Sequence, residues 1–221
     1  MVAKVSQMLS HSIRGQCITA PFEADPQLKV MEDILSGSGK RCFVRANDSD
    51  LVVLGVRSLL WDVGVNAGGL LGDCIMQTNI LHPRAGDFEI NSKPFTFLRK
   101  LHGVDPDNSL STWSSNEEDV MDRLRNHACV AGNDYTKFVG IGPMLALDIA
   151  TPHGPPLSPD QIATSLAAFL SSFQAEVVLP QLKRSMDIFC HPVVWDPATG
   201  AHRHLSGVET SANITSNTGA L

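Results

Sequence analysis

The 221-residue sequence contains 43% hydrophobic and 18% charged residues, and its formal net charge of −6 gives a pI near 5.7. This composition excludes wholesale disorder, and the acidic charge argues against a protein that grips nucleic acid mainly by neutralising phosphates. Because no apolar stretch reaches the roughly 20 residues that span a bilayer and the N-terminus lacks the apolar centre of a signal peptide, we expect an intracellular protein.

The first part of the sequence has the pattern of a βαβ unit. Residues 2–13 have the spacing of a short amphipathic helix, and residues 16–19 have that of a brief buried strand. Apolar residues at helical spacing predict a helix over 23–35, which a Gly-Ser-Gly cluster ends, and residues 42–44 begin a second strand. A right-handed crossover between these strands makes them parallel, so that their carboxyl ends emerge at one edge of the sheet.

Four carboxylates follow these two strands. Glu23 and Asp25 come just after the first strand, and Asp48 and Asp50 come just after the second. We expect all four to converge at the edge where open α/β sheets bind ligands. Crowded carboxylates favour a cation among them, and oxygen-rich clusters suit Mg²⁺ or Mn²⁺. A single acid at such a position more often caps a helix. For the two pairs taken together, the residues alone favour a metal site and helix capping equally.

The middle of the sequence adds a fifth acid and a glycine turn. The elements expected there are a short apolar segment at 51–55, a strand at 58–63, a hairpin and a long loop within 66–115, and a helix from Ser115 or Asn116 to about residue 130, with Val120, Leu124 and Cys129 facing inward. Asp134 follows this helix. The turn Gly140-Ile141-Gly142 precedes a helix that starts at Pro143. Two glycines before a helix allow backbone N–H groups to approach a phosphate, although a turn that only packs two helices has the same pattern.

The C-terminal part is mostly helical in pattern. A capping-box sequence at 158–161 predicts a helix that stops before Pro180, and a second short helix is expected at 181–188. Residues 191–197 have the pattern of an extended segment. The tail from 206 to 221 is rich in Ser, Thr, Asn and Gly, which is typical of disorder.

Four segments together resemble the XPG and flap endonuclease superfamily of structure-specific 5′ nucleases, and most of all its exonuclease 1 branch. The family's apolar strand and acidic segment are similar to ITAPFEADPQL, and its strand, acid pair and glycine tail are similar to VRANDSDLVVLGV. Its Gly-Cys-Asp-Tyr element and Gly-Ile-Gly helical hairpin are similar to CVAGNDYTKFVGIGPMLALDI, and the segment after the hairpin is similar to IFCHPVVWDPATG. The four segments occur in the family's order over most of residues 18–200, which makes the joint resemblance specific.

The resemblance implies an α/β fold with a partial PIN-like (5′ nuclease) parallel sheet flanked by helices, followed by a helix-hairpin helical region. It implies a nuclease core over residues 1–134, a DNA-binding helical hairpin with C-terminal helices over 135–200, and a tail over 201–221. The implied activity is that of a 5′ exonuclease or flap endonuclease, which hydrolyses DNA phosphodiester bonds in repair or replication. The implied location is the nucleus, and the implied partners are flap, nicked or 5′-ended duplex DNA.

The resemblance also implies roles for individual residues. The acids that would hold two Mg²⁺ (or Mn²⁺) ions about 4 Å apart are Glu23, Asp25, Asp48, Asp50 and Asp134. One ion would activate the attacking water and the other would stabilise the leaving oxygen. The residues that would bind DNA are Gly140, Ile141 and Gly142, whose loop carbonyls hold K⁺ in the family. Apart from the resemblance, the charge of Lys137 makes it a candidate for a phosphate contact, although a solvated surface lysine is the commoner explanation.

Some family features have no counterpart in this sequence. The family's amino-terminal half, with a first strand, two further metal-binding aspartates and basic residues, is not present. Met144 stands where the family commonly has Lys, and Asn133 stands where it commonly has Cys. Three interpretations follow: a fragment of an active nuclease, which we expect; a chain completed by a partner subunit; and a nuclease-like module that binds DNA or acts as a scaffold without cleavage. A PIN-like ribonuclease would share the acid cluster but does not need the Gly-Ile-Gly hairpin.

The remaining candidate residues point to structural roles. The five cysteines lie far apart without a CxxC pair, which excludes a zinc ribbon or a disulfide framework and predicts reduced core thiols. Five of the histidines show no metal-ligand spacing to one another, namely His82, His102, His127, His153 and His191. A parallel sheet without its first strand would expose an apolar edge and face, so we expect poor solubility or a partner that covers them.

Overall fold

The structure is a computed structural model that describes residues 20, 23–66, 69–76, 80–83, 92–103, 116–133, 141–151 and 155–205. The helix expected at 2–13, the strand expected at 16–19 and the tail at 206–221 lie outside the described residues. In the described part of the chain, no helix combines the length and the apolar character that crossing a membrane requires.

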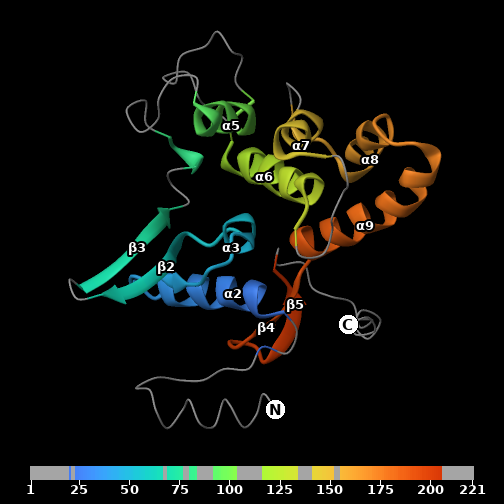
Figure 1. Ribbon diagram of the computed structural model, residues 1–221. Helices are drawn as coiled ribbons and strands as arrows, with labels where there is room; N and C mark the ends of the chain where they lie inside the picture. The colour runs from blue at the N-terminus through green and yellow to red at the C-terminus, as the bar shows by residue number, and fades with distance from the viewer. Residues whose placement is uncertain are drawn as a thin grey trace.

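The chain combines helices with two small sheets, in agreement with the α/β class (Figure 1). The described helices are α2 (Ala24–Gly37), α3 (Asp50–Val53), α5 (Lys93–Leu101), α6 (Glu117–Ala131), α7 (Pro143–Ala150), α8 (Pro159–Ala167) and α9 (Ser172–Cys190). The described strands are β1 (Val44–Arg45), β2 (Ser58–Asn66), β3 (Gly69–Met76), β4 (Val193–Asp196) and β5 (Ala201–His204). Helix α5 is a correction, because the sequence predicted only a hairpin and a long loop in that region.

The larger sheet has the strand order β1-β2-β3. β1 pairs with β2 in parallel, with Val44 opposite Leu59, and β2 continues into an antiparallel hairpin with β3. The parallel partner expected for β1 was the segment 16–19, which is outside the described residues. The parallel pairing that the structure describes is that of β1 with β2, and the short helix α3 lies in the crossover between them.

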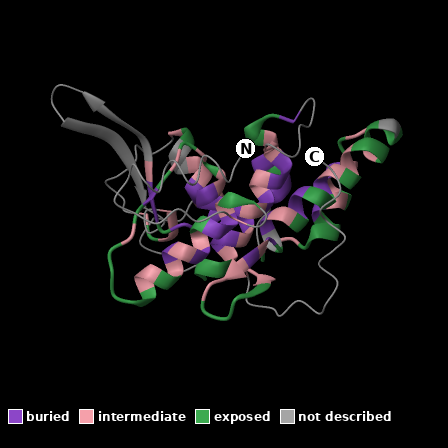
Figure 2. Cartoon of the chain, turned by 90° about the horizontal axis from the view of Figure 1, so that it is seen from below, coloured by how far each residue is buried: buried purple, intermediate pink, exposed green. Residues whose placement is uncertain are grey.

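Helix α6 is the centre of the core. It begins at Asn116, whose side chain accepts a hydrogen bond from the Glu118 N–H, and it packs against α3, α5, α7, α8 and α9 (Figures 1 and 2). Val120, Leu124 and Cys129 are buried, which confirms the predicted inward positions. The same hydrophobic cluster contains residues from both sides of the predicted boundary after residue 134, and the division into a core and a hairpin domain stays a prediction.

The predicted break between the two C-terminal helices is wrong. The chain bends after α8, and α9 starts at a second capping box in which the Gln174 N–H donates to Ser171 Oγ and the Ser171 N–H donates to Gln174 Oε1. Pro180 lies inside α9 on its exposed side. The carbonyl of the exposed residue Glu176, which Pro180 deprives of its helical partner, faces a region where water can hydrate it, so the helix continues.

Two long-range polar contacts fix the position of α2. Near its N-terminal end, the Gln27 side chain accepts from the Trp195 N–H and donates to the Trp195 carbonyl, both at 2.9 Å. In its C-terminal half, the Glu32 carboxylate, only 1% exposed, accepts from the backbone N–H groups of Arg57 at 2.9 Å and Ser58 at 3.1 Å. One end of α2 is thereby attached to β4 and the other to the start of β2.

The extended segment predicted at 191–197 is confirmed as β4, and the structure adds β5 to form a hairpin. Asp196 closes its turn by accepting from the Ala198 N–H at 2.9 Å, and it also accepts from Arg203 Nε at 2.9 Å. These contacts lower the pKa of Asp196, the backbone hydrogen bond from Ala198 being the largest cause.

Candidate metal centre

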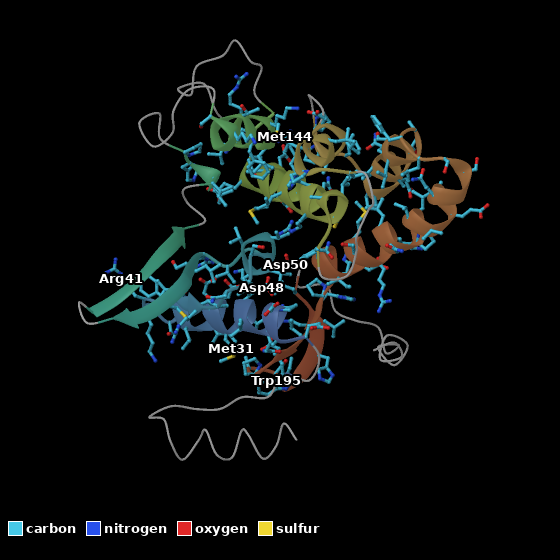
Figure 3. The ribbon with its side chains drawn as sticks, viewed as in Figure 1. Met31, Arg41, Asp48, Asp50, Met144 and Trp195 are labelled. Carbon is cyan, nitrogen blue, oxygen red and sulfur yellow. The ribbon has the colours of Figure 1, made fainter. Side chains whose placement is uncertain are left out.

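Asp48 and Asp50 lie close together at the carboxyl end of β1 (Figure 3). β1 ends at Arg45, and the Asp50 N–H donates to Asp48 Oδ1 at 3.0 Å, so that Asp48 caps the first turn of α3. The single turn of α3 is closed by a hydrogen bond from the Leu54 N–H to the Asp50 carbonyl at 2.9 Å. α3 ends at Val53 with Leu54 as its C-cap, and the next residue is Gly55, whose φ of 92° lies in the left-handed region that favours glycine.

Apolar packing holds this acidic pair in place. The three residues that follow Asp50 are all buried, and they join the core cluster around α6. Both aspartates are themselves half-buried. The pair is therefore anchored by the apolar half of the same short segment.

Glu23 and Asp25 lie at the other predicted position, the start of α2. Glu23 is the N-cap residue and is exposed, and its side chain makes no capping hydrogen bond. Asp25 is half-buried in the first turn, where the positive end of the helix dipole favours a carboxylate. Of the four described acids, Asp48 thus has a demonstrated capping role and Glu23 does not.

The structure brings Asp48 and Asp50 together, and it packs α2 against α3. Carboxylate oxygens are donors of the kind that Mg²⁺ and Mn²⁺ prefer, so the donor chemistry fits. However, no group of three or more His, Cys, Asp or Glu side chains within the described ranges is arranged to hold a metal ion. Asp134, the fifth acid, lies outside those ranges.

The predicted DNA-binding turn is described only in part, because Lys137 and Gly140 lie outside the described residues. Ile141 is buried in the core and fixes the end of the turn, whereas Gly142 is the exposed N-cap of α7. A Cβ atom at Gly142 would meet no heavy atom within 4 Å. The glycine is thus not required by packing, and the backbone at this helix start is open to a ligand.

A contact from α6 supports the start of α7. The Pro143 carbonyl accepts a hydrogen bond from His127 Nε2 at 3.2 Å, and the His127 ring packs edge-on against Phe97 of α5, with ring centroids 5.0 Å apart. Burial lowers the pKa of His127, more than the hydrogen bond to Pro143 raises it. His127 is therefore a neutral packing residue near neutral pH, in agreement with the structural role expected for the histidines.

Asn133, where the family commonly has Cys, joins two helices. Its Nδ2 group donates to the Ala128 carbonyl at 3.3 Å and to the Ser185 hydroxyl of α9 at 2.6 Å. Ser185 is fully buried. The asparagine thus connects the end of α6 to α9 immediately before Asp134, and the exchanged residue has a structural function of its own.

Sequence reasoning missed the buried polar residues that position these elements. Besides Gln27 and Glu32, Arg123 of α6 is buried and donates to the Leu101 carbonyl at 3.0 Å, beside Gly103, whose φ is 64°. A Cβ atom at Gly103 would approach Arg123 Nη2 to 3.0 Å, so this glycine serves both the turn and the close packing. No periodic signal distinguishes such residues from ordinary surface charges, because their partners are backbone groups far along the chain.

Comparison with known proteins gives no further assignment. The sequence matches no known family and no curated protein. The resemblance to the 5′ nuclease superfamily therefore depends on the four segments described above. Of these, two segments have their acidic pair within the described structure, the one with Glu23 and Asp25 and the one with Asp48 and Asp50.

Proposed function

We propose that the chain is part of a metal-dependent 5′ nuclease with a PIN-like fold, which hydrolyses DNA phosphodiester bonds as an exonuclease or flap endonuclease in the nucleus. The observation that carries the proposal is the pair Asp48 and Asp50, held side by side at the carboxyl end of a parallel strand. Ligands of open α/β sheets bind at that end of the strands. The partner is flap, nicked or 5′-ended duplex DNA.

The capping bond of Asp48 is compatible with metal binding. An ionised carboxylate has about four lone-pair sites on its two oxygens, and the Asp50 N–H uses one of them. In the proposal, Glu23, Asp25 and Asp134 complete this half of the site, and two further acids come from a partner chain or an amino-terminal portion. When bound, Mg²⁺ or Mn²⁺ would supply an activated water and stabilise the leaving oxygen.

The open N-cap at Gly142 supports the DNA-binding part of the proposal. Backbone N–H groups at a helix start favour a phosphate, and no side chain caps this helix in the structure. In the proposal, the turn from Gly140 to Gly142 grips the DNA backbone with a K⁺ ion on its carbonyls, and Lys137 contacts a phosphate. The Gly-Ile-Gly turn favours DNA over the RNA substrate of a PIN-like ribonuclease.

A second candidate is a nuclease-like module that binds DNA or acts as a scaffold without cleavage. The observation that favours it is that the acids assemble as a pair, and not as a group of three, within the described part of the chain. A pair of carboxylates can bind a metal weakly without holding two ions in the arrangement that hydrolysis requires. The two candidates differ in cleavage, not in DNA binding.

Isothermal titration calorimetry with Mg²⁺ and Mn²⁺ tests the metal site directly. The variants are Asp48→Asn and Asp50→Asn, and the matched control is Asp160→Asn, an exposed acid in the first turn of α8. Asn at position 48 keeps an oxygen that can accept from the Asp50 N–H, so α3 stays capped while the charge is lost. We expect both site variants to lose metal binding and the control to keep it. Equal binding by all three variants would contradict the proposal.

Cleavage assays then separate the candidates. The substrates are a 5′-flap DNA, a nicked duplex and a single-stranded RNA, each with Mg²⁺ or Mn²⁺. DNA cleavage that Asp48→Asn abolishes would establish a self-sufficient nuclease, whereas metal and DNA binding without cleavage would assign the chain to a half-site or a non-cleaving module. Gly142→Ala should weaken DNA binding at unchanged stability, because its Cβ atom meets open space in the free protein.

A further inference from the structure

Two histidine rings lie against each other where the β4–β5 hairpin meets the end of α9. His191 is the C-cap residue of α9, and His204 is the last residue of β5. Their ring centroids are 6.0 Å apart, and the ring planes make an angle of 74°. Because His191 is exposed and His204 is half-buried, small solutes can reach both rings. We call these two residues the histidine pair.

A hydrogen bond fixes the tautomer of His204. Its Nδ1 atom lies 3.0 Å from the His191 carbonyl, and because a carbonyl oxygen can only accept, Nδ1 carries the hydrogen. In the neutral imidazole the lone pair is then on Nε2, which makes no hydrogen bond to the described residues. Proteins commonly orient a metal-binding histidine in this way, with one ring nitrogen bonded to a backbone carbonyl and the other facing the metal.

The backbone that carries the histidine pair is held in place from both sides. The Leu205 N–H donates to the Pro192 carbonyl at 2.8 Å, which joins the direct neighbours of the two histidines. The His191 N–H closes the last turn of α9 with a hydrogen bond of 3.0 Å. The two side chains thus start from fixed positions before any ligand binds, so little backbone ordering opposes the binding of an ion.

We propose that the histidine pair binds Zn²⁺. An imidazole nitrogen binds Zn²⁺ at about 2.0–2.1 Å, which puts the ring centroid about 3.2 Å from the ion, so two rings on a tetrahedral ion have centroids about 5 Å apart. The observed 6.0 Å is close to this value, and rotation of the exposed His191 side chain brings the rings to it. No group of three or more His, Cys, Asp or Glu side chains in the described ranges is arranged to hold a metal, so water takes the remaining positions.

This site differs from the candidate metal centre in place and in chemistry. Figure 3 draws Trp195, a residue of β4, well apart from Asp48 and Asp50. Carboxylate oxygens suit Mg²⁺ and Mn²⁺, whereas imidazole nitrogens suit Zn²⁺, Ni²⁺ and Cu²⁺. Millimolar Mg²⁺ should therefore not displace Zn²⁺ from the histidine pair. The proposal does not depend on the proposed nuclease function.

Isothermal titration calorimetry of the full chain with Zn²⁺, in millimolar Mg²⁺, tests the site. We expect His191→Asn and His204→Asn each to lower the Zn²⁺ affinity of one equivalent at least tenfold. Asn at position 204 keeps an N–H that can donate to the His191 carbonyl, so the hairpin should stay folded. The matched controls are His202→Asn, on the same strand, and His82→Asn, both of which remove an exposed histidine side chain and should change the affinity less than twofold.

Two outcomes of the calorimetry would overturn the proposal. The first is a parent protein that binds no Zn²⁺, or binds it equally well in both site variants. The second is a loss in either control as large as the loss in the site variants, because the binding would then be a general property of surface imidazoles.

A second measurement locates the ion without changing either histidine. Val193 is opposite His204 in the hairpin and alternates with the buried Val194, so Trp195 lies on the same face as His204. Cu²⁺, which imidazoles bind more tightly than Zn²⁺, quenches the fluorescence of a nearby indole. We expect saturable quenching that a large excess of Zn²⁺ reverses and that Trp195→Phe largely removes. Equal quenching in the parent and in Trp195→Phe would place the ion elsewhere and refute the proposal.

Discussion

The carboxylate of Glu32 provides the most direct test of how the fold is held together. It lies in α2, is 1% exposed, and accepts hydrogen bonds from two consecutive backbone N–H groups at the start of β2. Glu32→Ala removes the acceptor of these two N–H groups and leaves a cavity next to them. We expect this substitution to destabilise the protein severely.

The expected loss follows from the number and kind of these bonds. A hydrogen bond to a charged group contributes about 1.5–3 kcal/mol, and leaving a buried donor unsatisfied costs about 1–3 kcal/mol. Because Arg57 is exposed, water can hydrate its N–H in the variant, whereas Ser58 is buried. Counting the Ser58 bond in full and the Arg57 bond in part gives a loss of about 3 kcal/mol, which lowers the melting temperature of a chain of this size by about 6–12 °C.

Urea unfolding followed by circular dichroism measures this loss as a change in the free energy of unfolding at constant slope. The matched control is Asp33→Ala, the next residue of α2, whose side chain is 40% exposed in its ion pairs with Lys29 and Arg57. Exposed ion pairs contribute at most about 1 kcal/mol, so the control should lose far less. A loss at Glu32 no larger than that at Asp33 would refute the assignment of Glu32 as a long-range contact.

Three further predictions test other contacts. Gln27→Ala removes both hydrogen bonds to the Trp195 backbone and should cost about 1–3 kcal/mol, with faster hydrogen exchange at the Trp195 amide as the specific readout. Pro180→Ala should stabilise the protein by about 1–3 kcal/mol in thermal unfolding, because it restores a helical N–H inside α9; a destabilised variant would contradict this. Because the pKa of Asp196 is lowered in the folded protein, its contribution to stability is complete above its ordinary pKa of 3.8. That contribution is lost as the pH falls through the folded-state pKa. Asp196→Asn should therefore flatten the dependence of the free energy of unfolding on pH below about pH 4.

Local signals in the sequence predicted the local structure well. The Asn116 cap, Pro143 at the first position of α7 and the capping box at Ser158 each mark a helix start that the structure confirms. These signals work because the donor, the acceptor and the helix lie within a few residues of one another. The buried positions of α6 were also predictable from local sequence, because the 3.6-residue period of apolar residues is a property of the helix itself.

Where two local signals competed, the sequence reading chose the wrong one. Pro180 was taken as a helix stop, whereas the true boundary is the capping box of Ser171 and Gln174, which begins nine residues before Pro180. A helix tolerates an interior proline better where the carbonyl that the proline deprives of a partner can reach water. That condition depends on burial, which is a property of the packed protein and not of the local sequence.

For the candidate site, the sequence placed Asp48 and Asp50 just after a strand, and the structure has them there, with the Asp50 N–H donating to Asp48 Oδ1. The metal site itself, with all the acids together, stays a prediction. The relation between this pair and the acids of α2 depends instead on where α2 lies, and that is fixed by contacts spanning 25 to 168 residues of sequence. No pattern within a window of one helix can predict contacts of that range.

The two contacts of α2 therefore connect the fold to the proposed metal site. Gln27 and Glu32 hold α2 by backbone groups of β4 and β2, so the position of Glu23 and Asp25 is set without a metal ion. If these acids share a metal with the Asp48 pair, Gln27→Ala should weaken metal binding in calorimetry although Gln27 is not a ligand. The conservative variant Gln27→Glu, at a pH where the carboxylate still accepts from Trp195, should restore part of the loss. If Gln27→Ala leaves the metal affinity unchanged and Asp48→Asn abolishes metal binding, the metal ligands lie in the segment after β1 and do not include the acids of α2.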